Sequence, residues 1–218
     1  MKITADLFRA CLECPTKCWL RAAGEASTEN AYAEWVKAQD ESFHAKEIGR
    51  LVGDLSNDEL AKSPEAEHLK SAKWQLATNI SLLTQMNSSA VESSLHAIER
   101  MPSEGRGRLA QFVPIRFVFR NKLTKDDKLL LAFDAFLLSE FLGREVGLGK
   151  IIHGDDHATF KVKTSALASK VRKLIEKTAA LLASPTPPHL VLNRHCAECE
   201  FRDRCSSRKP RAIGSSLT

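Results

Sequence analysis

The sequence predicts a single α/β domain, and three observations lead to this prediction. First, 218 residues with 43% hydrophobic content suit one soluble domain with a substantial core. Second, apolar side chains recur mainly at helical spacing in the first hundred residues, whereas 108–163 shows the patterns of strands. Third, no repeat or linker divides the chain. We therefore expect one domain over 1–205, followed by a basic tail over 206–218.

The part expected to be mainly helical, 1–100, carries several start signals. Thr4 is placed to cap a short helix, and Pro15 to open a second one. A longer helix is expected from about Glu29 to Arg50. Ser63-Pro64 predicts the start of another helix. Its apolar residues at helical spacing are Leu69, Ala72, Leu76, Ile80 and Leu83.

The part expected to form a sheet of three or four strands, 108–163, begins with an alternating strand over 113–119. Lys125 to Lys128 predicts a turn. The apolar run from Leu129 to Leu138 predicts a central strand that is buried on both faces. Further strands are expected over 150–153 and 158–163. A helix should then occupy 164–183 and end at the SPTPP segment, 184–188.

Charge and cysteine use bear on the compartment and on the partner. The net charge is +5, and cations are dense in 106–125 and 202–211, which permits nucleic-acid binding without requiring it. The start of the chain has no secretory-type apolar stretch, and the run 129–138 is too short to span a bilayer. We therefore expect a cytoplasmic protein with reduced cysteines, which favours metal or iron–sulfur ligation over disulfides.

The cysteines fall into two groups at opposite ends of the chain. Cys11, Cys14 and Cys18 lie near the start, whereas Cys196, Cys199 and Cys205 lie near the end, with none between residues 18 and 196. This split predicts that the two ends of the chain meet. The C-terminal trio supplies three soft ligands, so a cluster needs a fourth from far away. Cys14 is the first choice, with Cys18 or Cys11 as substitutes and His195 as another candidate.

Two other interpretations of the cysteines remain. Cys11-x-x-Cys14 and Cys196-x-x-Cys199 also form the pair of knuckles that binds zinc, although zinc leaves Cys18 and Cys205 unexplained. Free structural thiols are the third interpretation.

Asp134 is the only charged residue in the apolar run 129–138, and a buried carboxylate requires a cation. One interpretation is a salt bridge to Arg116 or Arg120. The other is a magnesium ligand with Lys150 close by. His44 and Glu47 share a predicted helix and are weaker candidates. The chain has no GxGxxG, P-loop, GxSxG or HExxH motif, so Walker-type hydrolysis, serine chemistry and zincin chemistry lack support.

Three segments together resemble the RecB-like nuclease family of the PD-(D/E)xK superfamily. They are FRACLECPTKCWLR, LLLAFDAFLL followed by GKIIHG, and HLVLNRHCAECEFRDRC. More distantly they are similar to the iron–sulfur nucleases of CRISPR adaptation and the AddB nuclease domain. The resemblance implies a restriction-endonuclease-like core, with a mixed sheet flanked by helices and a C-terminal iron–sulfur staple. It also implies that Cys14, Cys196, Cys199 and Cys205 hold a [4Fe-4S] cluster.

The resemblance further implies that Asp134 holds Mg²⁺ or Mn²⁺ and that Lys150 assists phosphodiester hydrolysis. The acidic position two residues before Lys150 is occupied by Leu148, which cannot ligate a metal ion. Glu145 would replace it only if the strand bulges. The later Gln-x-x-x-Tyr motif of the family is absent from 164–182, while His44 or Glu47 matches an early helix motif weakly.

These features predict three functions. The first is a metal-dependent DNA nuclease with a degenerate active site, in which basic segments hold the DNA backbone. The second is a nuclease fold without chemistry that serves as a DNA-binding or assembly module, in a system with other domains or proteins. The third is a zinc-stabilised structural protein without a DNA role.

Overall fold

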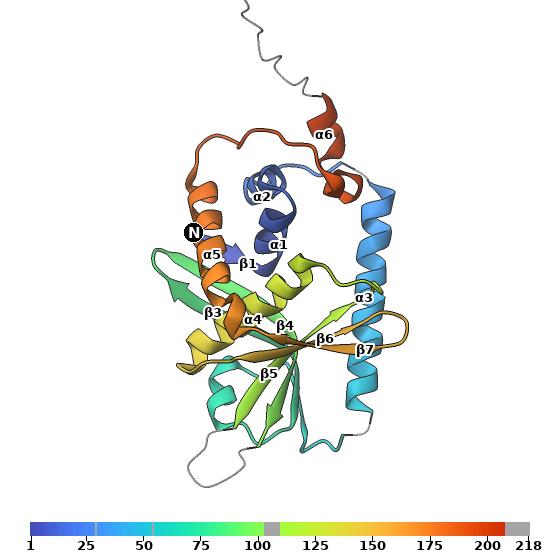
Figure 1. The fold of residues 1–218 in the computed structure, drawn as a ribbon, viewed down its shortest axis with the longest axis vertical. Helices are drawn as coiled ribbons and strands as arrows, with labels where there is room; N and C mark the ends of the chain where they lie inside the picture. The colour runs from blue at the N-terminus through green and yellow to red at the C-terminus, as the bar shows by residue number, and fades with distance from the viewer. Residues whose placement is uncertain (29, 54, 103–109, 208–218) are drawn as a thin grey trace, which may run out of the picture.

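The computed structural model describes residues 1–28, 30–53, 55–102 and 110–207, and it shows a mixed α/β fold (Figure 1). A curled mixed sheet is flanked by helices. The strands are β1 Lys2–Thr4, β2 Leu60–Lys62, β3 Leu76–Met86, β4 Ser89–Met101, β5 Gln111–Val118, β6 Leu148–His153 and β7 Ala158–Lys163. The helices are α1 Ala5–Glu13, α2 Pro15–Ala22, α3 Ala31–Val52, α4 Lys125–Leu142, α5 Ala168–Ala183 and α6 Arg202–Ser207. Short 3₁₀ helices are η1 Ala66–Ser71, η2 Ser165–Leu167 and η3 Arg194–Glu198.

Within the described ranges, one sheet contains seven strands rather than the three or four expected. Its order is β2-β3-β4-β5-β6-β7, and β1 pairs with β4. The pairs β2/β3, β5/β6 and β1/β4 are parallel, and the others are antiparallel. Because β3 occupies one edge of β4 along most of its length, β1 and β5 share the other edge. β1 lies beside 90–92 and β5 beside 97–101.

The prediction of a central strand over 129–138 is wrong, because this run lies in helix α4. All ten of its residues are buried, so the apolar pattern has no exposed face that would reveal the helical period. The ends of the helix are clearly marked in the sequence. Thr124 and Asp127 form a reciprocal capping box, and Gly143 ends the helix at a φ of 68°. The turn expected at 125–128 is therefore the first turn of α4.

The helix expected after Ser63-Pro64 is also wrong, so the first hundred residues are not mainly helical. Only the short η1 forms, and β3 and β4 follow as a long hairpin. Leu76 and Ile80, which are four residues apart, share a face in a strand as well as in a helix, whereas Leu83, the next residue of the predicted helical set, is 55% exposed. Asn87, at a φ of 53°, helps to form the two-residue turn that joins Met86 to its partner Ser89. Asn87 is therefore the residue in the sequence that indicates a hairpin turn at this position.

Several expectations are confirmed. Thr4 accepts a hydrogen bond from the Leu7 backbone N–H and caps α1, and Pro15 starts α2. The long helix α3, the strands β5, β6 and β7, and helix α5 before the SPTPP segment also lie close to their expected positions. No helix in the described ranges is long and apolar enough to cross a membrane.

The sheet has two distinct faces, and this distinction decides which candidate residues meet. One face packs against α4, which contacts β3, β4, β5 and β6, with α1 and α5 behind it. The other face packs against α3, where Ile115, Phe117 and Ile152 contact a cluster that includes Phe43 and Ile48. Adjacent residues of a strand therefore point to different helices.

Candidate functional site

The two ends of the chain meet at one cavity. Cys14, Cys196, Cys199 and Cys205 all line a cavity of about 230 Å³, together with His195. Cys14 lies at the junction of α1 and α2, and the other three come from η3, the turn after it, and α6. Figure 1 shows the orange-to-red C-terminal segment passing above α2 toward the N-terminal end of α3. We name this the cysteine cavity.

Polar contacts hold the C-terminal segment in place beside the cysteine cavity. Glu200 forms ion pairs with Arg21 and, at 3.3 Å, with the nearly buried Lys17. The Asn30 side-chain amide donates to the Cys199 carbonyl at 3.1 Å. Since these contacts join residues more than 160 positions apart, they set the geometry of the cavity independently of any metal.

The cysteine cavity is lined by four thiols from two segments of the chain, and thiols are the ligands that iron–sulfur clusters use. In the described ranges, however, no group of three or more His, Cys, Asp or Glu side chains is arranged so that it could hold a metal ion. Burial raises the pKa of the Cys199 thiol. Metal binding requires the thiolate, so a metal bound at this site would displace the thiol protons.

Cys11 and Cys18, the substitute ligands, do not line the cysteine cavity. Cys18 is fully buried, and its thiol donates to the Leu7 carbonyl at 3.3 Å. Cys11 lies beside it. The structure therefore separates these two cysteines from the four that surround the cavity.

Asp134 lies on helix α4 and not on a strand, and its carboxylate is engaged by a buried ion pair. Arg116 Nε donates to Oδ2 at 2.9 Å and Nη2 donates to Oδ1 at 3.0 Å, while the Ser93 hydroxyl donates to Oδ1 at 2.6 Å. Burial raises the pKa of the Asp134 carboxyl, and the Arg116 guanidinium opposes this effect. The salt-bridge interpretation is confirmed with Arg116. Arg120 pairs with Asp127 instead.

Lys150 lies on the opposite face of the sheet from Asp134. A Cβ at Gly149 would lie 2.9 Å from a methyl of Leu131 on α4, so Gly149 faces α4 and Lys150 faces away from it. Ile115, the register partner of Lys150, packs in the cluster on the α3 face. The ammonium of Lys150 pairs with Glu99. The structure thus does not bring the two expected catalytic residues together.

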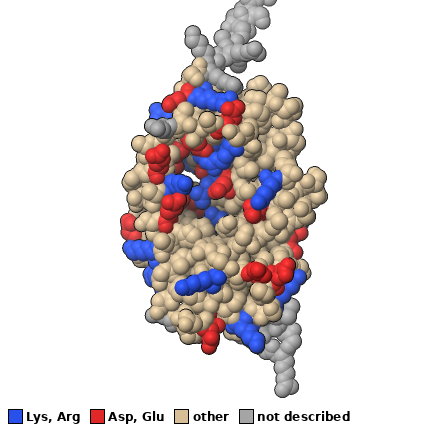
Figure 2. Space-filling model, turned by 180° about the vertical axis from the view of Figure 1, so that it is seen from behind, with Lys and Arg blue, Asp and Glu red and all other residues tan. Residues whose placement is uncertain are grey.

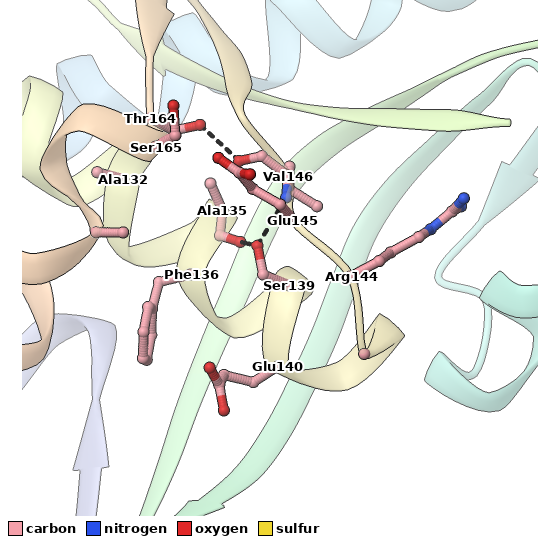
Figure 3. Close-up of a pocket in the computed structure, with 12 residues that line it drawn as sticks. Ala132, Ala135, Phe136, Ser139, Glu140, Arg144, Glu145, Val146, Thr164 and Ser165 are labelled. Atoms are coloured by element: carbon pink, nitrogen blue, oxygen red, sulfur yellow. Dashed lines mark hydrogen bonds between the residues drawn. The ribbon is translucent and has the colours of Figure 1, made fainter. Parts of the chain in front are cut away.

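Glu145, the substitute for the missing acid, lies on the α4 side as well. It lines a cavity of about 370 Å³ between the C-terminal half of α4 and the segment 164–168, shown in Figure 3. The hydrogen bonds drawn there join neutral groups, among them the Thr164 hydroxyl and the Val146 carbonyl at 2.7 Å. Leu148 is 52% exposed at the start of β6. Glu145 and Lys150 therefore lie on opposite sides of the sheet and do not form a metal site together.

His44 and Glu47 occupy different environments on α3. The His44 ring stacks on His96 of β4 with a centroid distance of 4.3 Å, and the Phe117 backbone N–H donates to His96 Nδ1 at 3.1 Å. Glu47 is fully buried and pairs with Arg50 and with His157 Nδ1, at 2.9 and 2.5 Å. In the described ranges, neither of the two α3 residues belongs to a group of three or more His, Cys, Asp or Glu side chains that could hold a metal ion.

A third cavity, of about 440 Å³, is bordered by His44, His96, Arg9 and Arg116. His96 and Arg9 are not among the candidate residues of the sequence, which predicts no strand at the position of β4. The charged side chains around this cavity have both signs, since Asp6 and Glu92 also border it. The cavity therefore has neither the carboxylate set of a magnesium site nor a purely cationic lining.

The stacked imidazoles predict a pH dependence of stability. Burial lowers the pKa of both His44 and His96, with a further contribution from Arg116. Below pH ~6.5 the unfolded chain therefore binds protons that the folded chain does not, and stability falls as the pH falls. Each histidine should contribute a slope of up to about 1.4 kcal/mol per pH unit.

This dependence is measured by denaturant unfolding between pH ~5 and ~7. His44→Gln should flatten the slope, whereas the exposed His189→Gln should leave it unchanged. An identical slope in His44→Gln and the wild type would contradict the assignment.

Comparisons with known proteins support the fold. No protein-family model matches the chain, and no curated protein matches it. Its structure is similar to the solved structure described as the crystal structure of SSO0001. The identity is 16%, the alignment covers 98% of this chain and 88% of that chain, and the TM-score is 0.55. At this identity the likeness shows a shared fold alone.

Proposed function

We propose that this chain is an iron–sulfur DNA-processing module with a RecB-like nuclease fold of the PD-(D/E)xK type, and that it has lost hydrolytic activity of its own. The observation that carries the proposal is the cysteine cavity, where Cys14 meets Cys196, Cys199 and Cys205. These four positions match the iron staple of that family. A cluster bound there supplies a cross-link between the two ends of the chain.

We infer the loss of hydrolytic activity from the positions of Asp134 and Lys150, which lie on opposite sides of the sheet, each in an ion pair of its own. Asp134 is already neutralised by Arg116, and Lys150 by Glu99 across the sheet. A carboxylate that is bound twice by a guanidinium and once by a hydroxyl has no free oxygen directed at a metal ion. Together with Leu148, this arrangement favours a non-catalytic module over an active Mg²⁺- or Mn²⁺-dependent nuclease.

DNA is the proposed partner on grounds of charge and of the family resemblance. The excess of five positive charges is modest, and Figure 2 shows Lys and Arg interspersed with Asp and Glu on one face rather than a uniform basic area. The densest basic segments, 106–125 and 202–211, lie partly outside the described residues, at 106–109 and 208–211. We assign the phosphate contacts to the cations of these segments other than Arg116 and Arg120, which pair with Asp134 and Asp127.

The test combines metal analysis with DNA assays on anaerobically purified protein. We expect iron and sulfide in the protein, salt-sensitive binding of single- or double-stranded DNA, and no cleavage in Mg²⁺ or Mn²⁺. Replacing Arg208, Lys209 and Arg211 by Gln should weaken binding and reduce its salt dependence.

Each of three other results would favour an alternative function. A colourless protein with stoichiometric zinc would replace the cluster by a structural zinc site. DNA cleavage that Lys150→Ala abolishes would restore the nuclease interpretation. If the protein carries the cluster but binds no DNA, the assembly role without DNA is favoured.

A further inference from the structure

The third cavity lies where the sheet divides. β1 pairs with residues 90–92 of β4 and β5 with residues 97–101, so residues 93–96 of β4 lie between the two partner strands. Beyond Ile115, β5 is no longer in register with β4, and the Phe117 backbone N–H donates to His96 Nδ1 at 3.1 Å. The opening has a volume of about 440 Å³, and α1, α3, β3, β4 and β5 all contribute to its border. Ligand sites often lie where neighbouring strands of a sheet separate.

Two imidazoles at this cavity have nitrogens available to a ligand. Because His96 Nδ1 accepts a hydrogen bond, its neutral ring carries the proton on Nε2 and is a donor there. The His44 ring stacks on it at a centroid distance of 4.3 Å. His44 Nε2 is buried and has no hydrogen-bond partner in the described ranges. A buried polar atom without a partner costs free energy, so a ligand that bonds to this nitrogen gains stability from it.

Two guanidiniums border the same cavity. Arg116 uses Nε and Nη2 for Asp134, so its Nη1 takes no part in that ion pair. Arg9 is held more loosely, since its Nη1 lies 3.5 Å from the Asp40 carboxylate and both side chains are more than a third exposed. An exposed pair of this kind contributes little stability, so Arg9 is able to turn toward a bound anion. The fork of guanidinium donors matches the oxygens of a phosphate group.

The two guanidiniums make the surroundings of the imidazoles more positive. Burial is the largest cause of the lowered pKa of His44 and of His96, but Arg116 lowers both values and Arg9 also lowers that of His96. A bound anion would compensate this positive potential.

Of the two carboxylates at the border, Glu92 is paired with Lys2 at 2.9 Å. Asp6, in the first turn of α1, is the carboxylate that opposes an anion.

We propose that this cavity is an anion site for a phosphate group, bound by two guanidiniums and two imidazoles. These belong to Arg9, Arg116, His44 and His96. The phosphate is either free inorganic phosphate or the terminal phosphate of a nucleic-acid strand, because both present the same oxygen acceptors. Tetrahedral phosphate has acceptors in several directions, which suits donors that come from four different elements. The site goes beyond the proposed function, since it requires neither the cluster nor the basic segments.

Isothermal titration calorimetry of the full-length protein with inorganic phosphate tests the site, at constant pH and at an ionic strength held constant with sodium chloride. We expect saturable binding at a single site. Arg9→Gln should weaken it at least about tenfold, because it removes a charge-assisted hydrogen bond. Arg172→Gln is the matched control, since Arg172 also lies 3.5 Å from a carboxylate, that of Glu140, but does not border the cavity. Its affinity should stay within about twofold of the wild type.

The imidazoles and the opposing carboxylate are tested in the same way. His44→Phe keeps an aromatic ring beside His96 but has no nitrogen, so it should weaken phosphate binding. Asp6→Asn should strengthen it, because it removes a negative charge at the border. In NMR spectra, the imidazole protons of His44 and His96 should shift when phosphate is added, whereas those of the exposed His189 should not.

An oligonucleotide with a 5′-phosphate, compared with the same oligonucleotide with a 5′-hydroxyl, distinguishes the two sources of phosphate. Tighter binding of the phosphorylated form that Arg9→Gln abolishes would assign the site to a strand end. Equal binding of both forms, together with saturable binding of inorganic phosphate, would assign it to free phosphate.

Two results would overturn the proposal: no saturable binding of inorganic phosphate, or equal phosphate affinity in Arg9→Gln and Arg172→Gln. The titration with inorganic phosphate contains no DNA and does not depend on iron, so its failure is distinct from a failure of the proposed function.

Discussion

Replacing Arg116 by Ala is expected to lower the free energy of unfolding by about 3–5 kcal/mol, because it leaves the Asp134 carboxylate buried without its partner. Arg116 is 3% exposed and Asp134 is 1% exposed. The ion pair joins β5 to α4, the helix that fills the centre of the main core.

Denaturant unfolding of three variants measures this effect. Arg120→Ala is the matched control, because Arg120 also pairs with an α4 carboxylate but its side chain is 45% exposed. It should cost no more than about 1 kcal/mol. The double variant Arg116→Met/Asp134→Leu should recover much of the loss, since it removes both charges. A loss below about 1 kcal/mol for Arg116→Ala would show that the buried pair does not stabilise the fold.

Replacing Cys196 by Ser is expected to remove the proposed cluster together with its broad visible absorption. Iron per chain should fall from about four atoms to less than one, because a [4Fe-4S] cluster depends on all of its thiolate ligands. The melting temperature should fall as well, since the cluster joins Cys14 at the α1–α2 junction to η3 and α6.

Cys18→Ser is the control for this prediction, because Cys18 is a buried thiol of the same N-terminal group that does not line the cavity. It should keep its iron. Equal iron loss in Cys18→Ser and Cys196→Ser would mean that the ligand set includes the N-terminal pair. Iron retained in Cys196→Ser would favour His195, which also lines the cavity, as a replacement ligand.

Local signals in the sequence were sufficient for some elements and for the grouping of cysteines. Thr4, Pro15 and the SPTPP segment correctly mark helix ends, because capping and backbone restriction act over a few residues. The absence of cysteine between residues 18 and 196 correctly predicts that the chain ends meet. The carboxylate of Asp134 correctly indicates a buried cation partner.

The run 129–138 shows where local signals fail. A fully buried helix and a fully buried strand have the same continuous apolar pattern, so periodicity cannot distinguish them. The error moved Asp134 from a helix to a strand and so placed it beside Lys150. The prediction of a helix where the β3–β4 hairpin forms is wrong for a related reason. Residues four apart share a face in a helix and also in a strand.

By itself, the sequence determined the cysteine grouping, the marked helix ends and the need of Asp134 for a cation, because each depends on chemistry carried by a few residues. Only the tertiary structure decided that Cys14 rather than Cys11 or Cys18 faces the C-terminal trio, and that Asp134 and Lys150 lie on opposite sides of the sheet. These outcomes depend on which face a side chain occupies. A face is defined only when strands are in register and helices are packed against them.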